Sequence, residues 1–207
     1  MKGLLLKDWY MAKKYCRSHF LIVIVFLAVS IADVSNLFFL TYPCIFVATI
    51  PTVLLSYDER CRWDEYCGAL PVSKSLFVSE KFVFGLLVTV PVIIATGIIQ
   101  TIILKRAGTF DFSYVMELAS ILLFTAALVT AVTMPFMIKF GVEKGRIAYY
   151  VMIGFATALA VFLPDVINAD LSGKVNIGFA PFAIVAAVAL YALSWYLSIV
   201  FYKKREI

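Results

Sequence analysis

Long windows that are almost free of charged residues constrain this chain more than any other feature of its sequence. A helix that crosses the apolar core of a bilayer needs about 20 apolar residues. Windows that meet or approach this length recur six times and leave little chain for a soluble domain. The predicted spans are residues 18–35, 37–57, 82–104, 115–138, 147–164 and 179–202. The sequence therefore predicts an all-α polytopic membrane protein with six transmembrane helices, in a single domain over residues 1–207.

The composition agrees with a chain that folds in lipid. Hydrophobic residue types make up 63% of the chain and charged types 15%, and the mean hydropathy is +0.98. In soluble proteins, hydrophobic types average roughly 45–50% of residues and charged types about 25%. Intrinsic disorder is excluded because so much apolar surface would stay unburied. A soluble helical bundle is disfavoured because the windows are apolar on every face.

The first window is the shortest, since its charge-free part runs only from Ser18 to Ala32. It spans the bilayer if Asp33 to Asn36 turn near the far interface. A basic start, an apolar run and small residues are also typical of a secretory signal peptide. The long basic segment before this window and the five windows after it favour a membrane span.

The positions of the basic residues predict how the spans are oriented. Of the 18 Lys and Arg residues, only Lys105, Arg106 and Lys174 fall on the outer side in a six-span topology. Loops on the cytoplasmic side are enriched in Lys and Arg, so both termini are expected in the cytoplasm. The net charge of +5 then reflects topology and contact with anionic lipid. It does not require a nucleic-acid partner.

Motifs for common enzyme chemistries are absent from the sequence. There is no G-x-x-x-x-G-K-[ST], so the chain has no P-loop ATP site of its own. The single histidine, His19, cannot supply a typical zinc-protease site, and Cys61 and Cys67 lack zinc-site spacing. We therefore expect no catalytic residue, metal or bound cofactor. No acidic residue lies at mid-depth of a predicted span, which disfavours an ion-coupled carrier.

Away from the ends of the predicted spans lie Pro43, Pro51, Pro91 and Pro135. Proline removes a backbone hydrogen-bond donor and can kink a helix. Kinked helices suit a bundle that opens and closes. Because proline is also frequent in membrane helices generally, a static bundle is an equally good interpretation.

Residues 1–17 are predicted to form a helix on the cytoplasmic membrane surface. Apolar residues at helical spacing form one stripe, and basic residues that can reach lipid headgroups surround it. The stripe is Leu5, Trp9, Ala12 and Cys16, and the basic residues are Lys7, Lys13, Lys14 and Arg17. An interfacial aromatic and a basic face are typical of such helices. The alternative is a plain basic segment that orients the first span.

The loop 58–81 is the only sizeable hydrophilic stretch. Its first part, Asp58–Tyr66, is predicted to be a short helix. Trp63, Tyr66 and Leu70 then share one side of the segment, amid charges of both signs. Buried aromatic anchors of this kind dominate the energy of protein interfaces. The loop therefore predicts a docking surface, and the alternative is an ordinary solvated connection.

The residues of this loop resemble the inner loop of bacterial ABC-transporter permeases of the type-2 exporter superfamily. They are similar, within it, to the small six-span permeases that include the exporter of phenol-soluble modulin peptides. The matching stretches are Asp58-Glu59-Arg60, Arg62-Trp63-Asp64, Leu70-Pro71-Val72-Ser73-Lys74 and Glu80-Lys81-Phe82. The start of the chain is similar as well, in Met1-Lys2-Gly3-Leu4 and Lys7-Asp8.

This resemblance implies a mechanism and a set of partners. Two permease chains, identical or paralogous, would form a core above two separate P-loop ATPase subunits, which bind the ATP and Mg. The loop would supply a coupling helix that sits in a cleft of the ATPase, and residues 1–17 would be an elbow helix. The implied coupling residues are Asp58, Glu59, Arg60, Arg62, Trp63, Asp64, Tyr66 and Leu70. The implied location is the bacterial plasma membrane.

The resemblance also implies export of hydrophobic or amphipathic substrates, with peptides as the preferred class. The many aromatic residues would suit an apolar path open to lipid. Two other functions stay open at this point. One is a stand-alone ion-coupled carrier, and the other is a membrane scaffold or immunity protein that transports nothing.

Overall fold

The computed structural model describes residues 1–32, 37–63, 66–67, 73–108, 111–147, 150–151, 154 and 179–204. All long elements in these ranges are α-helices, as the sequence predicted. They are α1 (Lys2–Tyr15), α2 (Arg17–Ala32), α3 (Leu37–Ala48), α4 (Ile50–Arg60), α6 (Lys74–Ala107), α7 (Phe112–Phe140) and α10 (Phe179–Lys204).

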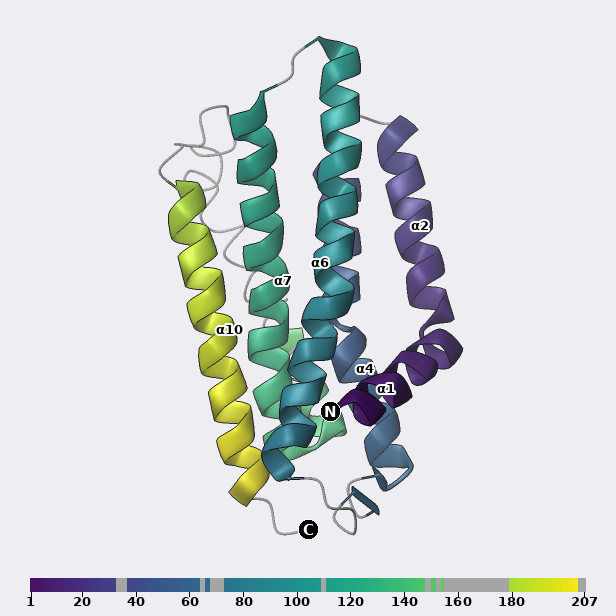
Figure 1. The fold of residues 1–207 in the computed structure, drawn as a ribbon, viewed down its shortest axis with the longest axis vertical. Helices are drawn as coiled ribbons and strands as arrows, with labels where there is room; N and C mark the ends of the chain where they lie inside the picture. Colours follow the sequence, from purple (N-terminus) through teal and green to yellow (C-terminus); the bar gives the residue numbers. More distant parts are fainter. Residues whose placement is uncertain are drawn as a thin grey trace.

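The long helices run lengthwise side by side, and α1 lies across one end of them (Figure 1). The axes of α1 and α2 differ by 70°, with the bend at Cys16 between them. The start of α1, the start of α6 and the ends of α7 and α10 all lie at the end of the bundle that α1 crosses (Figure 1). We call this the α1 end of the bundle.

Within the described residues, four helical segments are long and apolar enough to cross a membrane: Phe39–Arg60, which combines α3 and α4, Lys74–Arg106, Phe112–Phe140 and Pro181–Lys204. A fifth span is added if the bent pair α1 and α2 counts as one. The predicted first span corresponds to α2, which has 16 residues. Most of the predicted span 147–164 lies outside the described residues. Six spans therefore remain a prediction, with four or five supported.

The four prolines that were predicted to kink spans occupy two kinds of position in the helices. Pro43, Pro91 and Pro135 lie inside helices that continue past them. Pro51 follows a break between α3 and α4 and sits in the first turn of α4, where a missing backbone N–H costs nothing. At this break the Thr49 hydroxyl donates to the Phe46 carbonyl over 2.7 Å.

Near the α1 end, aromatic side chains join α10 to α6. The Tyr191 hydroxyl donates to the Phe82 carbonyl over 2.7 Å, and the Trp195 indole donates to the Ser79 hydroxyl over 3.0 Å. The Phe82 ring stacks on Trp195 with 5.7 Å between ring centroids. These contacts fix the register of the two helices where α6 begins.

Candidate functional site

The predicted coupling loop is shorter in the structure than the predicted range 58–81. Asp58, Glu59 and Arg60 form the last turn of α4 and do not begin a separate helix. The chain leaves α4 at Cys61, and Arg62 has a φ of 50°. A positive φ is costly for a residue with a side chain and ends regular helix there. The connection therefore runs over residues 61–73, because α6 already begins at Lys74.

Two aromatic residues of this connection lie together. The ring centroids of Trp63 and Tyr66 are 5.2 Å apart. Trp63 is half-buried against the core at the α1 end, and the Lys7 ammonium lies 4.4 Å from its ring centroid. The Tyr66 side chain is 58% exposed. Of the two predicted anchors, Tyr66 is therefore the one free to contact a partner.

The remaining two residues predicted for coupling, Asp64 and Leu70, lie outside the described residues. The side chains of Arg60 and Arg62 are exposed, and both lie close to the end of α4. Helix α6 after the connection starts with a side-chain cap, since the Ser73 hydroxyl accepts from the Leu76 amide over 3.3 Å.

The predicted surface helix corresponds to α1, and one of its faces packs on the protein. The buried residues of α1 are Leu4, Asp8 and Ala12, at helical spacing. In the predicted stripe, Leu5 is only half-buried and Trp9 is 39% exposed. Ala12 and Cys16 of the stripe are buried, at 1% and 0% exposure, and the lipid-facing role of the stripe stays a prediction. The burial of Asp8 beside them was not predicted, because hydropathy treats an aspartate as exposed. Lys13 and Lys14 are exposed, as expected for an interfacial helix.

Asp8 belongs to a buried cluster of charged side chains at the α1 end. The Lys81 ammonium lies 2.6 Å from Asp8 Oδ2 and 2.5 Å from Asp58 Oδ2. Lys7 Nζ lies 2.8 Å from Asp58 Oδ1 and 3.2 Å from Asp8 Oδ1. Glu80 Oε2 lies 3.8 Å from Lys81 Nζ. We call these five residues the charge cluster, and it joins α1, the end of α4 and the start of α6.

The charge cluster is shielded from water. Asp8, Asp58, Glu80 and Lys81 are each exposed by 2% or less, and Lys7 is exposed by 19% in its side chain. Burial by itself raises the pKa of Asp8, but Lys81, a hydrogen bond with Glu80, and Lys7 together outweigh it and hold that pKa below its usual 3.8. Burial raises the pKa of Glu80 to about 8, so its carboxyl is mainly neutral near pH 7. Because buried charges are tolerated only when paired, Lys7, Asp8, Asp58 and Lys81 depend on one another to stay in place.

Glu59 makes a second link across the α1 end. Its Oε2 accepts from the Val142 amide over 2.8 Å, at the start of the helical turn 142–147 that follows α7. Gly141, before it, has a φ of +84°, and a Cβ there would lie 3.0 Å from Glu59 Oε1. Glu59 thus caps the turn from 83 residues away in the chain.

Replacing Glu59 should test this cap directly. Glu59→Ala leaves the buried Val142 amide without its acceptor, and we expect the free energy of unfolding to fall by about 1–2 kcal/mol. Glu59→Gln keeps an acceptor oxygen and should lose less. Thermal unfolding in detergent measures both. Glu143→Ala, an exposed acid in the same turn, is the matched control and should be neutral.

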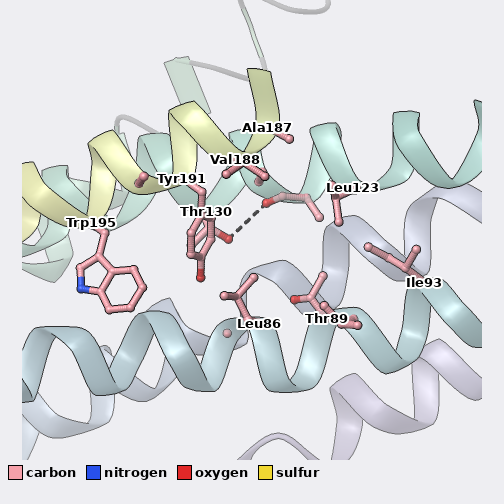
Figure 2. A pocket seen from close by; sticks show the side chains of 14 residues that line it. Leu86, Thr89, Ile93, Leu123, Thr130, Ala187, Val188, Tyr191 and Trp195 are labelled. Carbon is pink, nitrogen blue, oxygen red and sulfur yellow. Dashed lines mark hydrogen bonds between the residues drawn. The ribbon is translucent and has the colours of Figure 1, made fainter. Parts of the chain in front are cut away.

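An apolar cavity of about 280 Å³ lies between α6, α7 and α10. Figure 2 shows side chains of the three helices around it. Leu86, Val90 and Val188 are each 38% exposed or more, so the cavity opens on the surface of the bundle. Its few polar groups are largely satisfied, as at Thr130, whose hydroxyl donates to the Ala126 carbonyl over 3.2 Å. The cavity therefore suits an apolar group that arrives from the lipid side.

Comparison with known protein families covers nearly the entire chain. Residues 3–203 match the family described as ABC-2 family transporter protein. The chain belongs to this family. The resemblance to type-2 exporter permeases is thereby confirmed at the level of the superfamily, whereas the branch that exports phenol-soluble modulins remains a prediction. Comparison with curated proteins and with solved structures finds no match.

Membership of the ABC-2 family, together with four candidate spans, identifies a multi-pass membrane component of an ABC transporter. Such a component works with an ATPase subunit. The features at the α1 end lie where the predicted coupling loop enters and leaves the bundle.

Sequence reasoning missed the charge cluster as a site. It noted Lys7-Asp8 and Glu80-Lys81 only as parts of the resemblance. The available signal was position, because Asp8 falls between Leu4 and Ala12 on one helical face, and Lys81 directly precedes a charge-free window. A charge in such a place has to be paired or functional.

Proposed function

We propose that this chain is the transmembrane permease subunit of an ATP-driven ABC exporter. A separate P-loop ATPase subunit, which holds the ATP and Mg, docks on the connection 61–73 and on the last turn of α4. The observation that carries this proposal is the charge cluster. It fixes both ends of the connection to each other, through Asp58 on α4 and Lys81 on α6, and fixes α1 to the same point through Asp8.

This arrangement suits the transmission of force. A push on the connection reaches α4 and α6 together, because Lys81 bridges the two helices. Helix α1 follows them through Asp8. Buried ion pairs resist separation, since parting them leaves an uncompensated charge. The ATPase would therefore move these three helices as one unit, without melting the α1 end.

We further propose that the substrate is hydrophobic or amphipathic, with peptides as the preferred class. The apolar cavity supports this, because it opens on the surface of the bundle and its described lining residues include no charged side chain. The active unit would contain two permease chains in the bacterial plasma membrane, with both termini in the cytoplasm. The joint placement of the start of α1 and the end of α10 agrees with that topology (Figure 1).

Co-purification tests the proposed function. The tagged chain is solubilised from its native host in mild detergent, and the proteins that accompany it are identified by mass spectrometry. We expect a stoichiometric P-loop ATPase. If the chain emerges alone, under conditions that preserve known transporter complexes, an ion-coupled carrier or a scaffold becomes the better description.

Filling the apolar cavity tests the substrate path. Val90 lines the cavity from α6, so Val90→Trp should exclude a bound apolar group and lower substrate-stimulated ATP hydrolysis by about tenfold. Leu87→Trp is the matched control, because Leu87 is an exposed neighbour on α6 that does not line the cavity. Equal activity of the two variants in reconstituted vesicles would place the substrate path elsewhere.

A further inference from the structure

A second cavity, of about 310 Å³, lies at the α1 end between the last turns of α4 and the chain that follows α7. Three exposed cationic side chains line it, namely Arg60, Lys144 and Arg146. No hydrogen bond or ion pair joins these three side chains to another residue in the described part of the chain. Unpaired cations around one hollow favour an anionic ligand.

Two carboxylates also line this cavity, Glu59 and Glu143. Glu59 is engaged, because its Oε2 accepts from the Val142 amide and its Oε1 lies beside Gly141. The cations therefore outnumber the acids, and two of the three are guanidinium groups. Guanidinium donors form paired hydrogen bonds to phosphate oxygens, which makes phosphate the best matched anion.

An adjoining cavity of about 240 Å³ lies next to this hollow. Ser56 and Arg146 line both cavities and mark their junction. The adjoining cavity is lined mainly by apolar and aromatic groups of α3, α4 and α7, including Ile45, Phe46 and Met137. Its lining residues include Ser56 on α4 and Tyr42 on α3, on either side of the break between the two helices, and 14 residues at 1.5 Å each correspond to about 20 Å. A basic mouth thus leads into an apolar groove that points away from the α1 end.

We propose that these two adjoining cavities together bind one anionic phospholipid from the cytoplasmic leaflet. The phosphate lies among Arg60, Lys144 and Arg146, and an acyl chain follows the groove past Ser56. Basic pockets between membrane helices on the cytoplasmic side have the charge that lipid headgroups require. A soluble phosphate would fill only the mouth, and a cationic peptide would be repelled there.

The proposed lipid goes beyond the transport function and bears on its control. Its headgroup would contact Arg60, which follows Glu59 in the last turn of α4. Glu59 caps the turn at Val142, and the neighbouring Asp58 belongs to the charge cluster. A bound phosphate would therefore hold the chain after α7 against α4 and stiffen the base of the docking connection.

Native mass spectrometry of the purified full-length chain tests the proposal. The probes are dioleoylphosphatidylglycerol and dioleoylphosphatidylcholine, added at equal concentration in detergent. We expect about tenfold stronger retention of phosphatidylglycerol. Arg60→Gln, Lys144→Gln and Arg146→Gln together should abolish that preference. The matched control is Lys2→Gln with Lys203→Gln and Lys204→Gln, which neutralises three exposed lysines elsewhere and should keep it.

Two further arms separate a lipid from a soluble anion. Ser56→Phe obstructs the junction but leaves the three cations, so it should weaken phosphatidylglycerol retention by about tenfold. Glycerol 1-phosphate, the soluble probe, should fail to displace the lipid at equal concentration. If Ser56→Phe retains the lipid fully, or if both triple variants lose the preference equally, the proposal is wrong. Efficient displacement by glycerol 1-phosphate would also overturn it, in favour of a soluble phosphate site.

Discussion

Lys81→Met is expected to destabilise the protein more than any other single substitution in the described residues. Lys81 is 1% exposed, and its ammonium contacts the carboxylates of Asp8 and Asp58. Removing it leaves two buried carboxylates with only Lys7 nearby, a loss of about 3–5 kcal/mol in the free energy of unfolding. Detergent-resistant monomer after heating, followed by fluorescence size-exclusion chromatography, measures the loss.

Neutralising the two carboxylates that contact Lys81 should rescue the Lys81→Met variant. Lys81→Met combined with Asp8→Asn and Asp58→Asn removes the uncompensated charges, so most of the lost stability should return. Lys204→Met, which changes an exposed lysine at the end of α10, is the control and should be neutral. A Lys81→Met protein as stable as the wild type would contradict the charge cluster as a structural joint.

The same cluster predicts a weakness in acid. Asp8 has a folded-state pKa below its usual 3.8, because Lys81, a hydrogen bond with Glu80, and Lys7 together outweigh the effect of burial. Its contribution to stability is therefore complete above about pH 4 and is lost as the pH falls through the folded value. This loss should be missing from Asp8→Asn, which provides a check in the same unfolding assay.

Tyr66→Ala is expected to weaken ATPase binding with little effect on folding. Tyr66 is 58% exposed beside Trp63, so its ring is available as an interface anchor. Loss of such an anchor costs about 2 kcal/mol, or roughly thirtyfold in Kd. Titration of the purified ATPase against immobilised permease measures this change.

Trp63→Ala should behave differently, although both aromatics were predicted as anchors. Trp63 packs against the core and receives the Lys7 ammonium on its ring, so its loss should lower thermal stability as well as affinity. Tyr10→Ala, at an equally exposed tyrosine of α1, is the control for Tyr66. ATPase affinity left intact in both Tyr66→Ala and the double variant with Trp63→Ala would remove the docking surface from this connection.

Periodicity and hydropathy predicted the helices well because a helix that crosses lipid needs about 20 apolar residues in a row. Windows around Phe82–Leu104 and Phe179–Tyr202 lie within α6 and α10, whose boundaries lie at or beyond them. The boundary at Tyr57 was placed too early. Helix α4 continues through Asp58, Glu59 and Arg60. The Asp58 carboxylate pairs with Lys7 in the charge cluster, and the Glu59 carboxylate accepts from the Val142 amide.

The site could be predicted only in part, because its pairings join residues far apart in the chain. Hydropathy treats Asp8 as a residue for water, so its burial in the charge cluster was not predicted. Nothing local shows that Lys81 will neutralise Asp8. The cap of Val142 by Glu59 is equally invisible, since the partners are 83 residues apart. Exposed features such as Tyr66 were accessible to sequence reasoning because they depend on no distant partner.

The separation between Asp8 and Lys81, 73 residues, has a consequence for biogenesis. The chain is synthesised from its N-terminus, so α1 and α2 reach the membrane long before Lys81 leaves the ribosome. During this interval Asp8 has no Lys81 and is best kept in water, which leaves α1 undocked. Arrival of α6 then supplies the missing cation and lets α1 seat against the bundle. Insertion of the third predicted span would thus act as the assembly checkpoint for the first helix.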